Sequence, residues 1–152
     1  MRPGESVLIH GIGSGVATFA LQIARLAGAA LVIVTSGSSE KLRQAASLGA
    51  DVGLDYTSVD VGRKVREITA KRGVDVVIDC VGQATWSHSL VAAAKRGRIV
   101  TCGATSGPNP VEEIRTIFWK QLSILGSTMG SRGEVYELLD HVADMESLLT
   151  NL

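Results

Sequence analysis

The sequence predicts an α/β fold: a doubly wound sheet of six parallel strands with helices on both faces. Three observations indicate this fold. Short β-branched runs recur along the chain, an amphipathic stretch follows each run, and glycine is frequent (17 of 152 residues) whereas aromatic residues make up only 4%. Strands that alternate with helices form βαβ units with a parallel sheet. No linker, low-complexity tail or short-period repeat divides the chain, so we expect residues 1–152 to form one domain.

The first unit contains a glycine-rich turn. Residues 6–10 (SVLIH) favour a strand, residues 11–15 (GIGSG) a turn, and residues 16–26 a helix that ends at Gly28. Residues 30–35 form the second predicted strand. This strand is almost entirely apolar, as expected when helices cover both faces of a parallel sheet.

The remaining elements continue the alternation of strand and helix. We predict a helix at 40–48 that Gly49 ends, a short strand at 51–55, a polar surface helix at 61–71, a fourth strand at 74–79, a helix at 86–95, a fifth strand at 98–102, a loop at 106–110, a helix at 111–120, a sixth strand at 122–126 and a closing helix at 134–149.

Composition argues against several classes of protein. The 15 Lys and Arg residues balance the 15 Asp and Glu residues, whereas a nucleic-acid surface needs a basic excess. The sequence contains no run of 18 apolar residues that could span a membrane, and residues 1–5 lack the apolar segment of a signal peptide. Cys80 and Cys102 lie far apart in the sequence without histidines at ligand spacing, which favours a reduced cytoplasmic protein over a disulfide scaffold or a zinc site.

The glycine turn is the candidate ligand site. A dinucleotide pyrophosphate needs backbone amides that it can approach closely, directed at it from a helix N-terminus. Gly11, Gly13 and Gly15 allow the backbone angles of such a turn, and Ala17 is small enough for close packing of helix on strand. A tight strand-to-helix turn also needs glycine without any ligand, so simple turn geometry is the alternative interpretation.

A methyltransferase that uses S-adenosylmethionine could carry a similar glycine loop. Such sites usually have one acidic residue just before the loop and another after the second strand. Here Leu8, Ile9 and His10 precede the loop and residues 35–39 follow the second strand, and none of these is acidic. The dinucleotide interpretation therefore fits the sequence better.

The residues after the second strand also indicate which cofactor is bound. An NAD site places Asp or Glu there for the ribose 2′-hydroxyl, and an acidic side chain would repel a 2′-phosphate. This chain has Ser36, Ser38, Ser39 and Lys41 instead. Hydroxyl groups and an ammonium suit a phosphate, which favours NADP(H) over NAD(H). The alternative is that a serine caps the following helix and Lys41 is solvated.

Known catalytic arrangements are not found in the sequence. No Tyr-x-x-x-Lys or Gly-x-Ser-x-Gly motif occurs. We interpret His10 as a strand-end residue near the cofactor rather than a catalytic group. The other candidates are given structural roles: His88 and His141 at the surface or in packing, Cys80 and Cys102 as small core residues, and Trp86 and Trp119 as packing anchors. We therefore name no catalytic residue and no metal ligand.

The chain resembles the medium-chain dehydrogenase/reductase superfamily, in particular its quinone oxidoreductase and zinc-type alcohol dehydrogenase-like branch. The motifs that carry the resemblance are residues 4–11 (GESVLIHG), the glycine turn with residues 20–25 (ALQIAR), residues 35–38 with Lys41, residues 48–51 (LGAD), residues 55–56, residues 73–79 (GVDVVID) with 81–82, residues 97–100 (GRIV) with Gly103, and residues 125–130 (LGSTMG). Ordered motifs that cover the chain to about Val142 are far more specific than a glycine turn alone.

The resemblance implies a Rossmann fold and a set of cofactor-binding residues. By this resemblance, the pyrophosphate would lie on Ser14, Gly15, Val16 and Ala17. The 2′-phosphate would lie among Ser36, Gly37, Lys41 and Tyr56, the adenosine beside Val81 and Gly82, and the nicotinamide near Cys102, Gly103, Ala104, Thr105, Ser127, Thr128 and Met129. Family members often dimerise by pairing the sixth strand, here residues 122–126, and an uncovered apolar edge strand supports a homodimer in part.

The family's chain is much longer, and its separate catalytic domain, with the substrate pocket and any zinc ligands, does not occur in these 152 residues. We therefore expect the NADP(H)-binding domain of an oxidoreductase that transfers a hydride between the cofactor and a quinone, enone or alcohol/carbonyl substrate, incomplete for catalysis alone. The alternatives are a standalone, non-catalytic NADP(H)-binding module and a remnant that folds without binding a ligand.

Overall fold

The structure, a computed structural model, describes residues 1–143 and contains six strands and six helices in strict alternation. In chain order they are β1 (Ser6–Ile9), α1 (Gly15–Leu26), β2 (Leu31–Ser36), α2 (Ser39–Ser47), β3 (Val52–Asp55), α3 (Val61–Ile68), β4 (Val74–Asp79), α4 (Trp86–Ala92), β5 (Ala93–Thr101), α5 (Ile114–Lys120), β6 (Ser123–Gly126) and α6 (Arg132–Ala143). The predicted end of the last helix, 144–149, lies outside the described residues, as does the side chain of His141.

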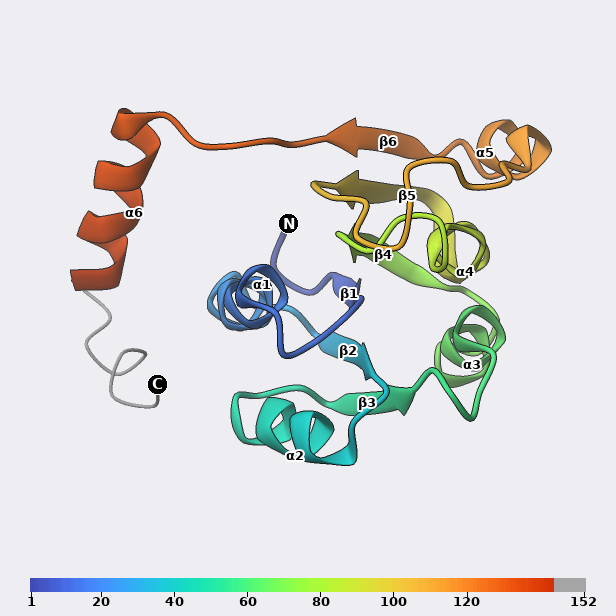
Figure 1. The fold of residues 1–152 in the computed structure, drawn as a ribbon, viewed down its shortest axis with the longest axis horizontal. Helices are drawn as coiled ribbons and strands as arrows, with labels where there is room; N and C mark the ends of the chain where they lie inside the picture. The colour runs from blue at the N-terminus through green and yellow to red at the C-terminus, as the bar shows by residue number, and fades with distance from the viewer. Residues whose placement is uncertain (144–152) are drawn as a thin grey trace.

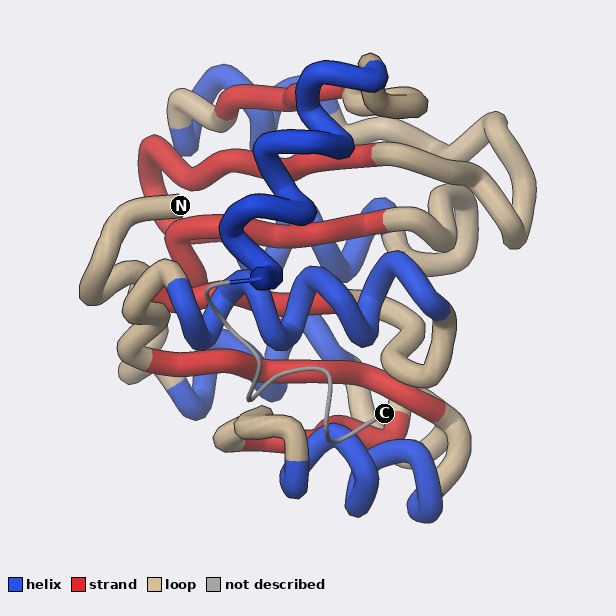
Figure 2. The backbone as a smooth tube through the Cα atoms, turned by 90° about the vertical axis from the view of Figure 1, so that its left-hand side faces the viewer, coloured by secondary structure: helices blue, strands red, loops and turns tan. Residues whose placement is uncertain are grey.

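The strands form one parallel sheet in the order β3-β2-β1-β4-β5-β6, which confirms the doubly wound α/β fold (Figure 2). This is the usual strand order of a Rossmann fold. Helices α1 and α2 cover one face of the sheet and α3, α4 and α5 cover the other, while α6 lies beyond α1 (Figure 1). Among the described residues no helix is long and apolar enough to cross a membrane.

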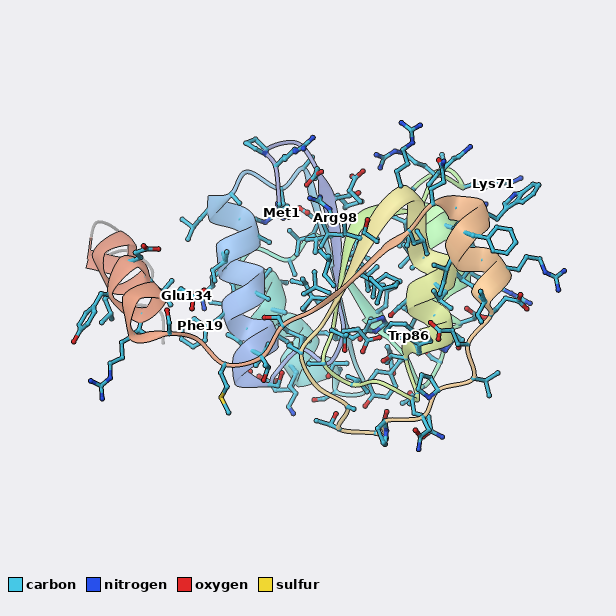
Figure 3. The ribbon with its side chains drawn as sticks, turned by 90° about the horizontal axis from the view of Figure 1, so that it is seen from above. Met1, Phe19, Lys71, Trp86, Arg98 and Glu134 are labelled. Atoms are coloured by element: carbon cyan, nitrogen blue, oxygen red, sulfur yellow. The ribbon has the colours of Figure 1, made fainter. Side chains whose placement is uncertain are left out.

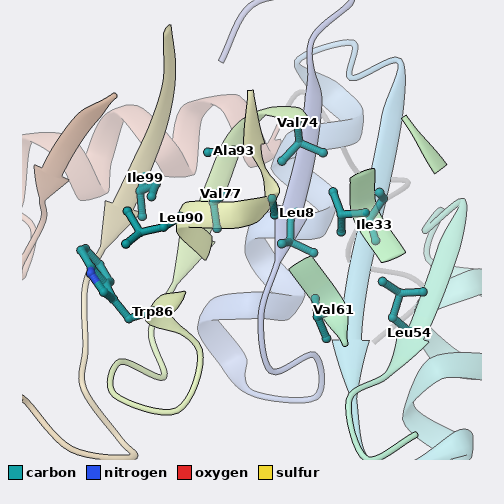
Figure 4. Packing of buried hydrophobic residues seen from close by; sticks show 12 residues of the cluster. Leu8, Ile33, Leu54, Val61, Val74, Val77, Trp86, Leu90, Ala93 and Ile99 are labelled. Carbon is teal, nitrogen blue, oxygen red and sulfur yellow. The ribbon is translucent and has the colours of Figure 1, made fainter. Parts of the chain in front are cut away.

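Two apolar clusters, one on each face, hold the sheet. The first is centred on Leu8, Ile33 and Val77 and packs against α3 and α4 (Figure 4). The second, with Ile9 and Val34, packs against α1 and α2. Successive strand residues point to opposite faces, so the continuous apolar runs of β1 and β2 supply both clusters.

The structure corrects three predicted boundaries. Residues 93–95, predicted to be helical, belong to β5, because Ala93 is extended (ψ 137°) and pairs with Val74 of β4. Sheet pairing here overrides the helix propensity of alanine. The ammonium of Lys120 donates hydrogen bonds of 2.7–2.9 Å to the carbonyls of residues 90, 91 and 93, where α4 ends. Helix α3 ends at Ile68 rather than residue 71, and α5 begins at Ile114 rather than residue 111.

Residues 102–139 are much less buried than the preceding part of the chain. All four residues of β6 are exposed, and α5 has no buried residue. Trp86 is buried, as predicted, but the prediction of a packing role for Trp119 is wrong, because its side chain is 77% exposed. Phe19, also exposed, lies on the side of α1 that faces α6 (Figure 3). Apolar surface therefore concentrates on this part of the molecule.

A paired carboxylate, that of Asp75, joins the N-terminal ends of β1 and β4. Asp75, near the start of β4, accepts hydrogen bonds from the backbone N–H (2.9 Å) and hydroxyl (2.8 Å) of Ser6 and forms an ion pair with Arg72. Burial raises the pKa of Asp75, but the hydrogen bonds from Arg72 and Ser6 outweigh it and lower the pKa to about 2. The side chain thus stays charged and joins β1 to β4.

Candidate functional site

The candidate site lies where the order of the strands reverses. β1 and β4 are neighbours in the sheet, but the chain leaves β1 toward α1 on one face and β4 toward α4 on the other (Figure 1). A crevice therefore opens beyond their carboxyl ends, the usual ligand position in this fold. A cavity of about 440 Å³ lies here, and its walls include His10, Gly11, Thr35, Tyr56, Val81 and Thr85.

The backbone angles and close contacts of the turn explain why glycine and other small residues occur in it. Gly11 and Gly13 have positive φ angles of 70° and 100°, which side-chain-bearing residues rarely adopt. A Cβ atom on Gly13 would lie 2.5 Å from the Cδ atom of Lys41, so the lysine side chain crosses the turn at this glycine. Ser14 caps α1 by accepting a hydrogen bond from the N–H of Ala17 (3.3 Å), and Ala17 is fully buried, as a close helix–strand contact requires.

Three backbone amides at the start of α1 are free to bind an anion. Among the described residues, no acceptor pairs with the N–H groups of Gly13, Gly15 and Val16. They lie in the turn and at the N-terminus of a 12-residue helix, where the helix dipole favours negative charge. By contrast, the N–H groups of Gly11 and Ile12 are already bonded to Thr35. The N–H groups of Gly13, Gly15 and Val16 are therefore available as donors to an anion, and we call these three groups the amide cradle.

The residues predicted for the 2′-phosphate lie near the end of β2. The phenol of Tyr56 packs against Gly37, where a Cβ atom would lie 2.9 Å from Oη, and the N–H of Tyr56 donates to the Ser36 carbonyl (3.3 Å). Ser38 is the N-cap of α2 and accepts from the N–H of Lys41 (3.4 Å), so the capping interpretation is also correct.

Acidic groups near the end of β2 are already paired. Glu40, in the first turn of α2, forms an ion pair with Arg43. Asp55, at the end of β3, accepts hydrogen bonds from the N–H (2.8 Å) and hydroxyl (2.7 Å) of Thr57. The Thr57 bonds lower the pKa of Asp55. The carboxylate that an NAD site would place after β2 is not found at residues 36–39.

A row of buried polar side chains lies beneath the cavity. Leu8 pairs in register with Ile33 of β2 and with Val77 of β4. Two residues further along each strand the side chains point to the same face, which brings together His10, Thr35 and Asp79. All three are at most 1% exposed, and Ser89 of α4, also buried, packs onto them. We call these four residues the polar row.

Hydrogen bonds connect the polar row from end to end. Thr35 Oγ1 lies 3.4 Å from His10 Nδ1, and Ser89 Oγ lies 3.1 Å from His10 Nε2. Ser89 also bonds to Asp79 Oδ2 (2.6 Å), which as a carboxylate can only accept. The Ser89 proton therefore points to Asp79, and Ser89 accepts from His10. His10 is thus the neutral Nε2–H tautomer, and its Nδ1 accepts from Thr35.

The charges of the polar row follow from its burial. Desolvation lowers the pKa of His10 to about 4, although Asp79 acts in the opposite direction. For Asp79, burial raises the pKa, but hydrogen bonds from Gly82, Ser89 and Thr85 and the proximity of His10 give a net lowering. The row therefore holds a neutral imidazole and an ionised carboxylate near neutral pH.

The loops after β4 and β5 are joined to each other. Asp79 Oδ1 accepts from the N–H groups of Val81 and Gly82, both at 3.0 Å. Ser106 donates to the Val81 carbonyl through its N–H (2.8 Å) and its hydroxyl (2.7 Å). Gly82 has φ 88°, and a Cβ atom there would lie 2.9 Å from Ala104. The predicted residues Val81 and Gly82 thus sit in a tightly braced turn.

The residues predicted for the nicotinamide are only partly brought to the cavity. Thr105 lies in its wall, whereas Cys102, Gly103 and Ala104 precede it in the loop after β5. Ser127, Thr128 and Met129 follow β6, further along the sheet; Ser127 donates to the Thr101 carbonyl (2.9 Å), and Met129 is almost fully exposed.

The prediction that both cysteines are core residues is wrong for Cys102, which is exposed because its strand has just ended. Cys80 is partly buried, and burial raises the pKa of its thiol. Both cysteines are free thiols.

Sequence reasoning missed several residues of the site. Thr35, Asp79 and Ser89 were not singled out, and His88, expected in packing or at the surface, lines the cavity, with Nδ1 3.5 Å from Asp60. For Thr35 and Asp79 the available signal was a polar residue at or near the end of an apolar strand run, whereas Ser89 and His88 lie on α4 and had no such signal. Among the side chains that the structure describes, no group of three or more His, Cys, Asp or Glu residues could hold a metal ion.

Comparison with known proteins identifies the relatives of this chain. Residues 15–144 match the family described as zinc-binding dehydrogenase. The chain is 38% identical to a quinone oxidoreductase of Pseudomonas aeruginosa over 95% of its own length and 44% of the relative. It is 35% identical to an NAD-dependent alcohol dehydrogenase of Sulfolobus acidocaldarius, over 92% of this chain and 40% of that relative. The chain therefore spans less than half the length of these relatives.

Solved structures show the same fold. A crystal structure of an NAD-dependent alcohol dehydrogenase superposes with a TM-score of 0.87 at 43% identity, covering 94% of this chain and 41% of that one. The quinone oxidoreductase of Escherichia coli complexed with NADPH gives a TM-score of 0.82 at 30% identity, covering 93% of this chain and 45% of that one. The described residues supply no group that fits a zinc ion, so the zinc in the family's description does not correspond to a site in them.

Proposed function

Because the chain belongs to the medium-chain dehydrogenase/reductase superfamily, whose cofactor-binding domain it matches, we propose that it binds NADP(H) as that part of an oxidoreductase. The hydride would pass between the nicotinamide and a quinone, enone or alcohol/carbonyl substrate. The observation that carries the proposal is the cradle of bare amides at Gly13, Gly15 and Val16, beside the cavity at the switch point.

Each part of the dinucleotide has a proposed place. The pyrophosphate lies at the start of α1, on the bare N–H groups of Gly13, Gly15 and Val16, with Ser14 and Ala17 beside it. The adenosine enters the cavity beside Val81 and Gly82, and the nicotinamide extends over the ends of β5 and β6, along Cys102–Thr105 and Ser127–Met129. The bound cofactor would supply the hydride, while the residues of this chain hold and orient it.

The preference for NADP(H) rests on Lys41. Its side chain crosses the glycine turn at Gly13 and brings an ammonium to the edge of the amide cradle. Ser36, Gly37 and Tyr56 would complete the surroundings of the 2′-phosphate, and Glu40 is neutralised by Arg43. Relatives of both kinds exist, since one is solved with NADPH and another is described as NAD-dependent.

A fluorescence titration of NADPH against NADH tests the proposal. We expect NADPH to bind more tightly, and Lys41→Ala to weaken NADPH by about tenfold or more, since a hydrogen bond to a charged group contributes about 1.5–3 kcal/mol. NADH binding should be weakened clearly less, because NADH has no 2′-phosphate and offers Lys41 only the pyrophosphate, which it shares with NADPH. Lys95→Ala is the matched control, because it removes the same charge from an exposed position near the start of β5, at the opposite end of the sheet from the turn. Equal affinities of the wild type for NADPH and NADH would contradict the preference. If neither bound, the glycines would serve only the tight turn between strand and helix.

We also propose a homodimer formed by pairing of β6. Ile124 and Leu125 are exposed on this edge strand, and Phe118 and Trp119 of the preceding helix are exposed beside it. Edge strands and apolar patches of this kind usually meet a partner. Sedimentation should show a dimer for the wild type and a monomer for Leu125→Lys. A wild-type monomer at high concentration would contradict the proposal.

The second candidate function is a non-catalytic NADP(H)-binding module. It is supported by the same cradle and by the described residues, none of which is a convincing general acid or base. Assays of the chain with NADPH and a panel of quinones and enals separate the two functions, because turnover requires a substrate site. We also propose a cytoplasmic location, because a chain with only two cysteines, far apart in the sequence, suits a reducing compartment.

A further inference from the structure

The polar row joins the two loops on which the dinucleotide would lie. At one end, Thr35 Oγ1 accepts a hydrogen bond from the N–H of Gly11 in the glycine turn (3.1 Å). At the other end, Asp79 accepts from Val81 and Gly82 in the loop after β4. Each end of the row therefore accepts hydrogen bonds from backbone N–H groups of a loop at the cavity.

The two loops also touch directly. A Cβ atom on Gly11 would lie 3.3 Å from Cγ2 of Val81, so their spacing has little tolerance. The row beneath fixes this spacing with one order of donors and acceptors: Gly11 N–H to Thr35, Thr35 to His10, His10 to Ser89, and Ser89 to Asp79. Reversing any one hydroxyl or imidazole would leave a buried donor facing a donor.

We propose that His10 is a positioning residue, which acts through Thr35 and Ser89 to hold the glycine turn and the Val81–Gly82 turn at the separation that the dinucleotide requires. The inference rests on the proposed function. His10 is only 1% exposed, although it lies in the wall of the cavity, so we expect its effect to be transmitted by Thr35 on one side and by Ser89 and Asp79 on the other. A neutral imidazole suits this place because each ring nitrogen has a different role, one donor and one acceptor.

The first test is Thr35→Val, which keeps the shape of the side chain and removes the hydroxyl. We expect NADPH to bind about tenfold more weakly, and Thr35→Ser to restore most of the affinity. Thr69→Val is a matched control, because Thr69 Oγ1 also accepts from a glycine N–H, that of Gly73 (2.8 Å), at the opposite end of the sheet. It should lower the unfolding midpoint in a similar way and leave NADPH affinity unchanged.

A double-mutant cycle then tests the connection through the imidazole. If His10 couples the two loops, Thr35→Val and Ser89→Ala together should weaken NADPH by clearly less than the product of their separate effects. Nitrogen NMR of the His10 ring at pH 7 should show the Nε2–H tautomer. Multiplicative effects, an Nδ1–H tautomer, or equal affinity losses in Thr35→Val and Thr69→Val would each overturn the inference. A wild type that binds neither NADPH nor NADH would instead show that the proposed function has failed, and the positioning role with it.

Discussion

Two aspartates of one strand, Asp75 near the start of β4 and Asp79 at its end, are held in opposite ways. Asp75 is partly exposed and paired with the Arg72 guanidinium, and its hydrogen bonds tie β4 to Ser6 of β1. Asp79 is fully buried and, within residues 1–143, has no ion pair. Its partners are two backbone amides and the hydroxyls of Thr85 and Ser89.

The comparison shows two different roles: Asp75 stabilises the sheet, whereas Asp79 orients the loops of the candidate binding site. An ion pair at the edge of the sheet needs only to close the structure, and its cation satisfies the charge. A buried carboxylate that accepts four hydrogen bonds instead fixes the orientation of each donor. The contacts at the N-terminal end of β4 therefore contribute mainly to stability, whereas those at its C-terminal end fix the geometry of the loops that follow.

The largest expected effect is that of Asp79→Ala. This change leaves two amides and two hydroxyls in the interior without their acceptor, so the free energy of unfolding should fall by about 3–5 kcal/mol. Urea denaturation measures it. Asp79→Asn retains a carbonyl oxygen for the amides and should cost about half as much. A loss below about 1 kcal/mol in Asp79→Ala would show that the loops do not depend on this carboxylate.

The pH dependence of stability should distinguish the polar row, which contains His10 and Asp79, from Asp75 near the start of β4. The pKa of His10 is lowered from 6.5 to about 4 in the folded state, so its stabilising contribution is complete above pH 6.5 and is lost as the pH falls toward 4. The loss amounts to about 3 kcal/mol. Asp75, with a pKa of about 2, loses its contribution only between about pH 4 and pH 2.

Urea titrations between pH 7 and pH 4 measure this effect, and His10→Gln provides the comparison. The variant should be less stable at pH 7 but should show a flatter decline in this range, because it has no group at this position that takes up a proton. An equally steep decline in the variant would assign the proton uptake to another group.

The smallest expected effect is that of Asp75→Asn. The amide keeps an oxygen for Ser6 and loses only the ion pair with the half-exposed Arg72, so the free energy of unfolding should fall by about 1 kcal/mol. NADPH affinity should remain that of the wild type in the same titration. A clear loss of affinity would remove the distinction between the two ends of the strand.

The strands and the glycine turn could be predicted because each depends on local sequence. Apolar runs of β-branched residues mark β1, β2 and β4, and Gly11 and Gly13 occupy positions with positive φ. Residues 93–95 were assigned wrongly because alanine and lysine favour helices, and only the pairing with β4 makes them a strand.

The polar row could not be found residue by residue. His10, Thr35 and Asp79 are far apart in the sequence, and each looks like an ordinary strand end. Their meeting depends on the register of β2, β1 and β4, which the sequence alone does not specify. Trp119 was misjudged for the related reason that a large aromatic residue predicts burial, whereas its helix presents it to solvent.

The uneven burial of the sheet has a consequence for the order in which the molecule opens. The amides of β1 and β4 lie between two apolar clusters, so deuterium should enter them only on global unfolding. Those of β6 are protected by a single neighbouring strand and by no buried side chain of their own. Their protection therefore reports the outer edge separately, and would rise in any assembly that covers it.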